Sequence, residues 1–326
     1  MRAIVYREYG GPEVLRLAEL ERPAPARGQV LVQVRASSIN SADQRMMRAH
    51  PFLVRLANGL FRPKKRLVLG QDVAGVVAAV GEGVTRFAVG DEVFGETPML
   101  SNGAFAEFTL AAEASLAPRP RGLSFEESAA VPLAGTTALQ ALRDLGRVTE
   151  ARQVLLVGAG GGVGLFAVQI ARLLGAEVTA VCGPRSVELV RALGAHEVID
   201  YTRDDFTARP RTWDTVVAIN GYRPLSAYRR ALAPGGRFVM VGGTNAQLFK
   251  TLLFARPFFA LDGKWGGALT LDERKRPADL TQLRAWLEAG RLRVHVDRRY
   301  PLTALVDAMT YVEQGHVSGK VVLTTG

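Results

Sequence analysis

Short apolar runs and longer periodic segments follow one another along the chain, and their kind changes near residue 124. Before that point, residues 29–37, 73–80 and 103–110 are runs rich in Val, Ala and Phe, bounded by Gly, Pro and Asp. Such runs are typical of β-strands. No periodic segment of helical length occurs in this part. The pattern therefore predicts a β-rich first part.

Strands and helices alternate in the second part. Ser124 and Glu127 have the spacing of a capping box, which predicts the start of a helix. Predicted strands follow at 153–157, 177–181, 197–200, 214–219 and 237–242, with helices near 162–174, 184–193 and 223–232. This alternation predicts an α/β fold with a doubly wound parallel sheet. Beyond residue 271, the pattern adds a helix at 278–290, a strand at 291–300, another helix and a closing strand at 319–325.

Composition places the chain among globular proteins. Of its 326 residues, 48% are hydrophobic and 22% are charged, which fits one or two domains with a sizeable core. The first residues lack the apolar core of a signal peptide, and no apolar stretch reaches spanning length. We therefore expect a cytoplasmic protein with no membrane span. The single cysteine, Cys182, excludes an internal disulfide framework and any multi-cysteine zinc site.

The net charge of +10 comes almost entirely from arginine, since the chain has 35 Arg and only 6 Lys. Many of these arginines need only be solvated. One stretch is more strongly basic, because only Asp43 opposes its seven cations. This basic stretch consists of Arg45, Arg48, Arg55, Arg62, Lys64, Lys65 and Arg66. It is a candidate for attracting an anionic cofactor, a substrate or nucleic acid.

A glycine-rich segment between a predicted strand and a predicted helix is the strongest chemical signal. In "VGAGGGVG" (157–164), the G-x-G-x-x-G positions fall on Ala159, Gly161 and Gly164, so alanine replaces the first glycine. Gly161 would let the backbone approach a pyrophosphate, and Gly164 would let helix and strand pack closely. The helix N-terminus would then hold the phosphates. The loop residues predicted to bind the cofactor are Gly160, Gly161, Gly162, Val163 and Gly164.

The end of the second strand of this unit predicts which dinucleotide binds. A carboxylate at this position accepts hydrogen bonds from a ribose 2′-hydroxyl and repels a 2′-phosphate. Residues 178–187 contain no acid, whereas Arg185 and Ser186 offer a cation and a hydroxyl. Both groups suit a phosphate. The alternative is a solvated arginine in a turn. The sequence predicts NADP(H) as the cofactor.

The order of these features resembles the medium-chain dehydrogenase/reductase superfamily, and most closely its zinc-free quinone oxidoreductase and enone reductase branch. The resemblance covers essentially the whole chain. It implies a GroES-like catalytic domain at 1–127 with 272–326, a Rossmann domain at 128–271 and a homodimer. The segments that carry it are "YGGPEVL" (9–15), "GQDVAGVVAAVG" (70–81), "FAVGDEVFG" (87–95), "AGTTALQAL" (134–142), "GGVG" (161–164), "LGAHEVIDY" (193–201), "LAPGGRFVMVGG" (232–243) and "GKVVL" (319–323).

The same resemblance argues against a metal site. Zinc-dependent members of the superfamily carry a His-Glu pair where this chain has Gln71-Asp72, and they have a cysteine cluster that this chain lacks. The four histidines, His50, His196, His295 and His316, have no ligand spacing. We therefore expect direct hydride transfer from the nicotinamide to a quinone or an α,β-unsaturated carbonyl, without a metal.

The resemblance also implies roles for single residues. Asn40 and Asp43 match an Asn-x-x-Asp near the nicotinamide, although the same spacing suits a simple Asx-type turn. Arg45 stands where some relatives have tyrosine, and it is a candidate cation for the developing oxyanion. Further cofactor contacts are implied for Thr136, Tyr201, Gly242, Gly243 and Lys320.

Two other functions and two surface segments stay open at this point. The alternatives are an enoyl-thioester reductase, and an NADPH-binding protein of low turnover that binds nucleic acid. The apolar segment 248–263 suits a pocket wall or a subunit contact, with a membrane-surface helix less favoured. Residues 267–272 are a candidate edge strand that pairs across a dimer.

Overall fold

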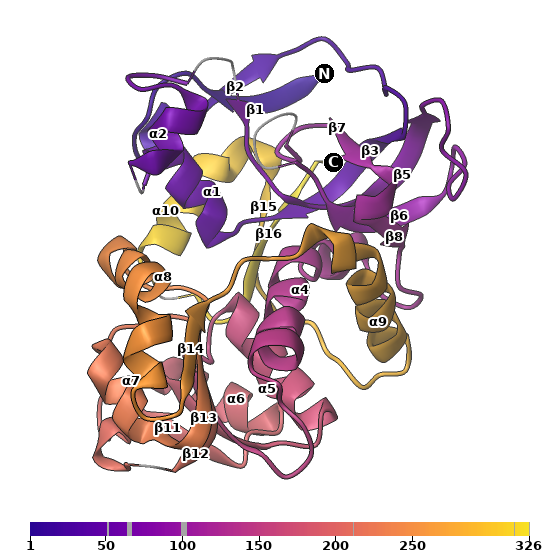
Figure 1. The fold of residues 1–326 in the computed structure, drawn as a ribbon. Coiled ribbons are helices and arrows are strands. Elements are labelled where there is room, and N and C mark those ends of the chain that lie inside the picture. The colour runs from indigo at the N-terminus through magenta and orange to yellow at the C-terminus, as the bar shows by residue number, and fades with distance from the viewer. Residues whose placement is uncertain (51, 64–66, 99–102, 211, 316, 326) are drawn as a thin grey trace. The chain divides into compact units, whose positions relative to one another are not determined.

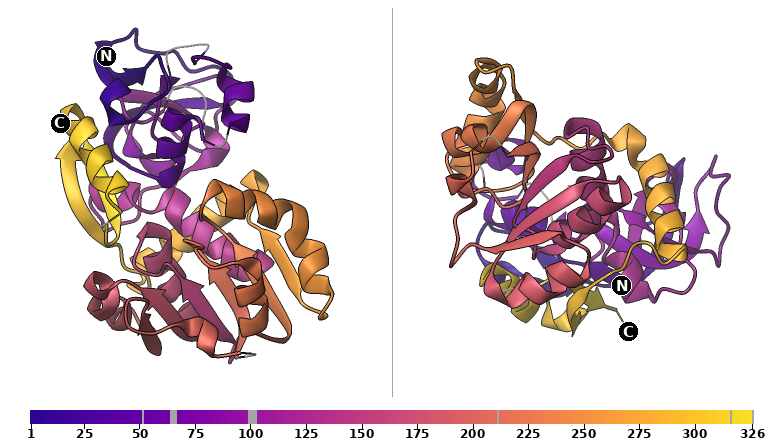
Figure 2. Two further views of the ribbon diagram at one scale, coloured as in Figure 1. Left: turned by 90° about the vertical axis from the view of Figure 1, so that its left-hand side faces the viewer. Right: turned by 90° about the horizontal axis from the view of Figure 1, so that it is seen from below.

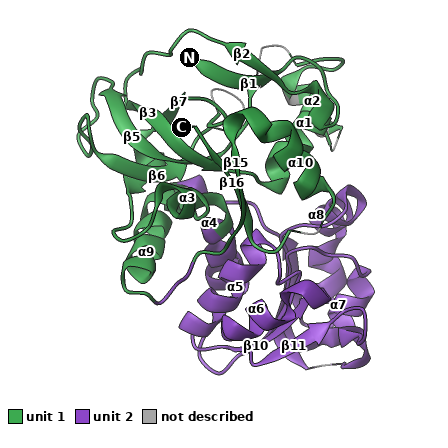
Figure 3. Ribbon diagram, turned by 180° about the vertical axis from the view of Figure 1, so that it is seen from behind, with its two compact units in different colours: residues 1–134, 274–290, 294–326 green, residues 135–273, 291–293 purple. Residues whose placement is uncertain are grey.

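The computed structural model describes the chain except for residues 51, 64–66, 99–102, 211, 316 and 326. Lys64, Lys65 and Arg66 of the basic stretch and His316 therefore lie outside the described residues. The chain forms two compact units (Figure 3). Unit 1 comprises residues 1–134, 274–290 and 294–326, and unit 2 comprises residues 135–273 and 291–293. The domain boundaries expected from the sequence stay a prediction.

Unit 1 is built on two sheets within its described residues. A three-stranded sheet has the order β2-β1-β4, and a seven-stranded sheet has the order β15-β16-β3-β5-β6-β8, with β7 paired to β3. The strands are β1 (Arg2–Tyr6), β2 (Arg16–Glu19), β3 (Gln29–Ser38), β4 (Leu67–Val68), β5 (Asp72–Val80), β6 (Glu92–Glu96), β7 (Phe108–Ala112), β8 (Leu116–Pro118), β15 (Val296–Pro301) and β16 (Lys320–Thr324). The closing strand β16 pairs with β3, which brings the C-terminal segment into the seven-stranded sheet.

Five helices accompany these strands in the described part of unit 1 (Figure 1). They are α1 (Ser41–Arg48), α2 (Leu53–Asn58), α3 (Phe125–Ala129), α9 (Arg276–Glu288) and α10 (Leu305–Glu313). Ser124 and Glu127 do form the predicted capping box at the start of α3. The expectation of no helix before residue 124 is wrong, because α1 and α2 are both helical. Both are short, and α1 is mostly polar, so their apolar periodicity is weak.

Unit 2 contains the predicted parallel sheet. Its strands are β9 (Gln153–Val157), β10 (Glu177–Cys182), β11 (Glu197–Asp200), β12 (Trp213–Ala218), β13 (Leu232–Met240) and β14 (Trp265–Ala268). The order is β11-β10-β9-β12-β13-β14, and every pair is parallel. When the strands are numbered within the unit, this order is 3-2-1-4-5-6, which is typical of dinucleotide-binding sheets. The strand order reverses between β9 and β12. The predicted fold class is confirmed.

Helices cover both faces of this sheet (Figure 2). They are α5 (Gly162–Leu173), α6 (Val187–Ala192), α7 (Leu225–Ala231) and α8 (Asn245–Ala260), while α4 (Pro132–Gln140) begins in unit 1 and ends in unit 2. Residues of α7 and α8 share one core cluster with β12 and β13, where Tyr228, Phe238 and Phe259 stack in sequence. Segment 248–263 is thus mostly helix α8. No helix in the described residues has the length and apolar character to cross a membrane.

Candidate functional site

The residues predicted to bind the dinucleotide lie after the carboxyl ends of neighbouring strands in unit 2. The glycine loop follows β9, Arg185 and Ser186 follow β10, Tyr201 follows β11, and Gly242 and Gly243 follow β13. Parallel strands end at the same edge of a sheet, so all these segments gather at one edge. Gly221, after β12, is bridged to Gly243 and donates from its backbone N–H to the Gly242 carbonyl at 2.9 Å.

The turn between β9 and α5 depends on glycines at two close approaches. Gly158 has a φ of +92°, and a Cβ there would lie 2.8 Å from the backbone nitrogen of Asn220. A Cβ on Gly164 would lie 2.4 Å from the carbonyl oxygen of Gly158. The tight turn thus uses Gly158, one residue before Ala159, and the packing role predicted for Gly164 agrees with this geometry.

Gly161 is different, because no contact among the described residues requires it to be glycine. Its φ is −84°, and the nearest atom to an added Cβ would be the Gly158 carbonyl oxygen at 4.0 Å. It is the N-cap residue of α5, whose first turn carries no acid. The first N–H groups of a helix have no partner within it and favour an anion. The space beside Gly161 therefore fits a pyrophosphate, which a side chain would displace.

The corner after β10 holds the predicted cation on the surface. Arg185 is exposed in a short 3₁₀ turn, Pro184–Ser186, that leads into α6. Ser186 is only 7% exposed, and its side chain lies against Gly160, where an added Cβ would meet the Ser186 hydroxyl at 2.5 Å. Ser186 thus supports the glycine loop, whereas Arg185 is accessible to a ligand.

One acid at this corner is missing from the sequence analysis. Asp200, the last residue of β11, is the register partner of Cys182 on the neighbouring strand. Its carboxylate accepts hydrogen bonds from the backbone N–H of Thr202 at 2.9 Å and from the Thr202 hydroxyl at 2.8 Å. The predicted strand at 197–200, which ends at Asp200 within the predicted parallel sheet, is the signal that could have found it. Tyr201 follows it, 54% exposed, with its ring against that of Tyr222.

A buried polar cluster in unit 1 surrounds Asp72, whose side chain is completely inaccessible. One carboxylate oxygen, Oδ1, accepts from the backbone N–H of Leu133 at 2.8 Å. The other, Oδ2, accepts from the Ser38 hydroxyl, from Asn40 Nδ2 at 2.9 Å and from Lys320 Nζ at 3.2 Å. Four donors therefore satisfy this carboxylate, as burial of a charge requires.

Lys320 and Asn40 are held by the same cluster. Lys320, the first residue of β16, is 4% exposed, and its ammonium donates to Asn40 Oδ1 at 2.6 Å and to the Ile39 carbonyl at 3.4 Å. The resemblance implies that Lys320 contacts the cofactor. In the structure, its ammonium is bound by protein oxygens and is shielded from solvent. The Asn40 amide nitrogen has, besides its bond to Asp72, a long contact with the Ser38 carbonyl at 3.4 Å. One N–H of Asn40 thus remains weakly bound.

Asp43 is buried one turn further along, in α1. Its Oδ2 accepts from the backbone N–H of Asn40 at 2.8 Å, and its Oδ1 accepts from the backbone N–H of Gly70 at 3.0 Å. Burial raises the pKa of this carboxyl group to about 7, and the nearby Asp72 adds to the rise. Asp43 therefore acts as the acid of the α1 capping box and positions the Asn40 backbone.

Four further residues bear on the chemistry. Gln71 is 7% exposed, and its Oε1 has no hydrogen-bond partner within the described structure; the buried Nε2 of Gln44 lacks one too. Arg45 is half-buried in α1, and burial lowers its pKa. Thr136, the last implied cofactor contact, is buried in α4. The unpartnered Gln71 oxygen is a polar atom that a substrate or water would satisfy.

The residues at the zinc landmark form no ligand set. Gln71 offers only a neutral amide, and Asp72 is committed to four donors. Cys182 is buried in β10, and burial raises the pKa of its thiol to about 11, which disfavours the thiolate that zinc needs. The described residues contain no cluster of three or more His, Cys, Asp or Glu side chains arranged to hold a metal ion.

Three features together define a dinucleotide-binding oxidoreductase. They are the strand order of the parallel sheet, the glycine loop after β9, and the pairing of the C-terminal strand β16 with β3. Comparison with known proteins agrees. Residues 26–121 match the alcohol dehydrogenase GroES-like domain, and residues 193–323 match the family described as zinc-binding dehydrogenase. The chain is 32% identical to a chloroplast envelope quinone oxidoreductase homolog of Arabidopsis thaliana, over 99% of this chain and 98% of that protein.

Solved structures place the chain more narrowly. A quinone oxidoreductase from Coxiella burnetii superimposes with a TM-score of 0.89 at 28% identity, covering 100% of this chain and 99% of that one. A mycobacterial protein complexed with NADPH superimposes with a TM-score of 0.85 at 28% identity, covering 99% of both chains. The chain belongs to the medium-chain dehydrogenase/reductase superfamily, in its quinone oxidoreductase branch. It is an oxidoreductase that uses a nicotinamide cofactor.

Proposed function

We propose that this protein reduces quinones or α,β-unsaturated carbonyls with NADPH and without a metal ion. The observation that carries the proposal is the state of Asp72. It occupies the zinc landmark, yet Ser38, Asn40, Leu133 and Lys320 use both of its oxygens. Metal-assisted alcohol oxidation needs a Lewis acid to stabilise the alkoxide, whereas reduction of a quinone or enone needs only donors for a developing oxyanion.

The cofactor fits the edge of the parallel sheet in unit 2. The N-terminus of α5 beside Gly161 would hold the pyrophosphate, and Gly242 and Gly243 would lie under the nicotinamide. Bound there, the cofactor supplies a hydride. Arg185 is the exposed cation after β10, and it would bind a 2′-phosphate. Asp200 is a carboxylate on the neighbouring strand β11, and Thr202 donates two hydrogen bonds to one of its oxygens, Oδ1. Arg185 is the feature that supports NADPH.

The cluster in unit 1 supports a role for Asn40 as the donor to the substrate oxygen. Lys320 donates to the side-chain oxygen Oδ1 of Asn40, and Asp72 accepts from the side-chain nitrogen Nδ2, so both ends of the side-chain amide are fixed. The remaining N–H, with only its long contact to the Ser38 carbonyl, is the group that would bind a carbonyl oxygen. Hydrogen bonding at the amide oxygen polarises the group and strengthens that donor. Lys320 and Asp72 are positioning residues, and Arg45 is a second candidate donor.

Features of unit 2 support the expected homodimer. β14 is an edge strand of the sheet within the described residues, and edge strands invite pairing with another chain. Beside it, α8 exposes Phe249, Leu252, Leu253 and Phe254, each at least half accessible. A second copy that met both features would remove this apolar surface from water. The expected cytoplasmic location stays a prediction.

The experiment is turnover of chelated protein against a panel of acceptors. NADPH consumption would be followed with benzoquinones, with enones, with enoyl thioesters and with simple ketones. The proposal predicts reduction of quinones or enones in protein whose zinc content is far below stoichiometric. Preference for enoyl thioesters would instead support the alternative reductase. Activity on none of these acceptors, with NADPH still bound, would support the alternative of a binding protein.

A further inference from the structure

Unit 1 carries an apolar surface on and beside helix α2 that the proposed chemistry does not use. Phe52, Leu56, Leu60 and Phe61 are 60%, 62%, 45% and 86% exposed. Phe61 is the most exposed of the large apolar side chains in the described chain. We call these four residues and Arg62 the 52–62 surface. An exposed cluster of this kind in a globular protein marks a contact with a partner or a membrane.

Contacts inside unit 1 hold this surface in place. The Tyr9 hydroxyl donates to the Gly59 carbonyl at 2.9 Å, and the Arg55 guanidinium lies over the Tyr9 ring at 5.0 Å. The Gly59 N–H donates to the Arg55 carbonyl at 2.8 Å. Val54 packs against the core, so the opposite face of α2, with Phe52 and Leu56 four residues apart, points outward. The apolar exposure is therefore a property of an anchored segment.

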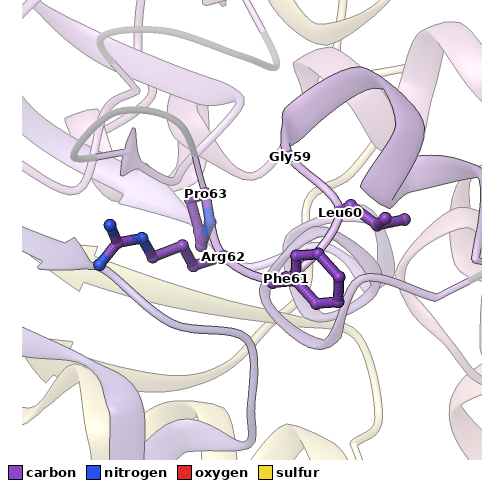
Figure 4. A pocket seen from close by; sticks show the side chains of 5 residues that line it. All are labelled: Gly59, Leu60, Phe61, Arg62 and Pro63. Atoms are coloured by element: carbon purple, nitrogen blue, oxygen red, sulfur yellow. The ribbon is translucent and has the colours of Figure 1, made fainter.

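The loop after α2 is hollowed and carries a positive charge at its rim. Residues 59–63 line a recess of about 410 Å³ (Figure 4). In that view, the Leu60 and Phe61 side chains extend to one side and Arg62 extends to the other. Leu60 and Phe61 thus present adjacent apolar groups beside an exposed cation.

The stretch of sequence that contains this surface carries charge of one sign. From Gln44 to Gln71 the sequence contains no acid, while it contains seven basic residues, and the whole chain carries +10. Arg48 pairs with Glu313 at 2.7 Å, while Arg55 and Arg62 belong to the same segment as the exposed apolar residues. Apolar side chains flanked by cations suit an interface with anionic lipid headgroups.

We propose that the 52–62 surface docks this protein on an anionic lipid bilayer. Leu60 and Phe61 would enter the boundary between headgroups and acyl chains, and Arg62 would contact the phosphates. Single-stranded nucleic acid also binds basic surfaces, but it requires aromatic rings for stacking. Two of the four apolar side chains here are leucines, which cannot stack on bases yet insert into lipid as well as phenylalanine. This proposal does not depend on the proposed reaction.

The test is flotation with vesicles of phosphatidylcholine alone or with about one third phosphatidylglycerol. The unmodified protein should float with the anionic vesicles, and high salt should release much of it. The double variant Leu60→Ser with Phe61→Ser should bind anionic vesicles about tenfold or more weakly, because it has no apolar side chains at these positions to insert into the bilayer. Arg62→Gln should weaken binding less. Circular dichroism and thermal unfolding would show that each variant folds.

The matched control is Leu17→Ser with Val89→Ser, which removes two exposed apolar side chains from unit 1 outside the 52–62 surface and leaves the proposed dimer contact on α8 unchanged. It should bind anionic vesicles like the unmodified protein. Equal binding of both double variants would overturn the proposal, as would failure of the unmodified protein to bind anionic vesicles. Binding to a poly-uridine oligonucleotide that the Leu60/Phe61 variant loses, without any vesicle binding, would assign the surface to RNA and also overturn it.

Discussion

At the scale of residues, the Asp72–Lys320 pair has the largest energetic consequence. Both side chains are almost fully buried, and their charges lie 3.2 Å apart. Removing one member of such a pair leaves an unpaired charge in the interior, which typically costs about 3–5 kcal/mol. Removing both leaves no such charge. The pair is therefore best examined as a unit.

We predict that Lys320→Met and Asp72→Asn each lower the free energy of unfolding by about 3 kcal/mol or more, and that the double variant loses clearly less than their sum. Urea unfolding measures the three values. Lys320→Met should also lower turnover while leaving NADPH affinity nearly unchanged, because Asn40 loses its fixed orientation. Strict additivity of the two stability losses would show that the charges do not interact.

Asp43 gives stability a pH dependence with a defined sign. Its pKa is about 7 in the folded protein and near 4 in the unfolded chain. Between these values only the folded state keeps the proton, so stability falls as pH rises from about 4 to 7, by up to about 1.4 kcal/mol per pH unit. Below pH 4 the contribution is fully present. Asp43→Asn should lack this slope. Glu188→Gln, at an exposed pair with Arg191, should retain it.

Arg185 sets the choice of cofactor in the proposed function. A charge-assisted hydrogen bond to a 2′-phosphate contributes about 1.5–3 kcal/mol, so NADPH should bind at least about tenfold tighter than NADH. Arg185→Ala should remove most of this difference and leave NADH affinity unchanged. Calorimetry with both cofactors measures it, with Arg191→Ala on the adjacent helix α6 as the control. A preference for NADPH that survives in Arg185→Ala would move the 2′-phosphate site elsewhere.

Single residues of the candidate site differ in how far the sequence could predict them. Gly164 is predictable, because its role depends on a local turn between strand and helix. The contacts of Lys320 are not, because its partners Asn40 and Asp72 are 280 and 248 positions away along the chain. Asp200 lies beside Cys182 only through the pairing of β10 with β11. Pairing is visible in a sequence, but the atoms that a side chain then meets are not.

At the scale of elements, two glycines in the turn before α5 allow cofactor binding and folding to be tested separately. Gly161→Val adds a side chain whose Cβ would lie 4.0 Å from the Gly158 carbonyl oxygen, the nearest described atom beyond the adjacent residues. We expect a folded protein with a small loss of stability, since valine is a poor N-cap residue, and no measurable NADPH binding. Gly164→Ala should instead cause a large loss of stability, because its Cβ would lie 2.4 and 2.5 Å from two carbonyl oxygens.

Thermal unfolding without cofactor distinguishes the two variants, and calorimetry measures NADPH binding by the Gly161 variant. Gly164→Ala should unfold at a lower temperature than Gly161→Val. If Gly161→Val folds and binds NADPH normally, the phosphates lie away from the N-terminus of α5.

Elements were predictable where their pattern is long or strongly apolar. The strands of unit 2 and α5 follow from apolar runs at regular spacing, and β3 and β5 from Val-rich runs. Helix α1 was missed, because its eight residues include only two buried apolar side chains, Met46 and Met47. Its start is signalled by Asn40 and Asp43, whose spacing equally suits a turn. Helix α2 has six residues, too few for a helical period to show.

At the scale of the whole molecule, the proposed dimer makes a simple prediction. Sedimentation should show two copies, and Phe249→Ser with Leu253→Ser on α8 should shift the equilibrium toward one, because both side chains are at least half exposed in the single chain. Leu60→Ser with Phe61→Ser in unit 1 is the matched control and should leave the dimer intact. A monomer at all concentrations of the unmodified protein would contradict the proposal.

The central claim is that hydride passes from NADPH to the acceptor with no metal ion in the protein. Single-turnover stopped-flow with chelated enzyme tests it most directly, with NADPH or its 4-deuterated form saturating and a reactive quinone or enone as acceptor. The account predicts loss of NADPH absorbance within one turnover, slower for the deuterated cofactor, and unchanged by added zinc. No oxidation until zinc is restored would contradict it.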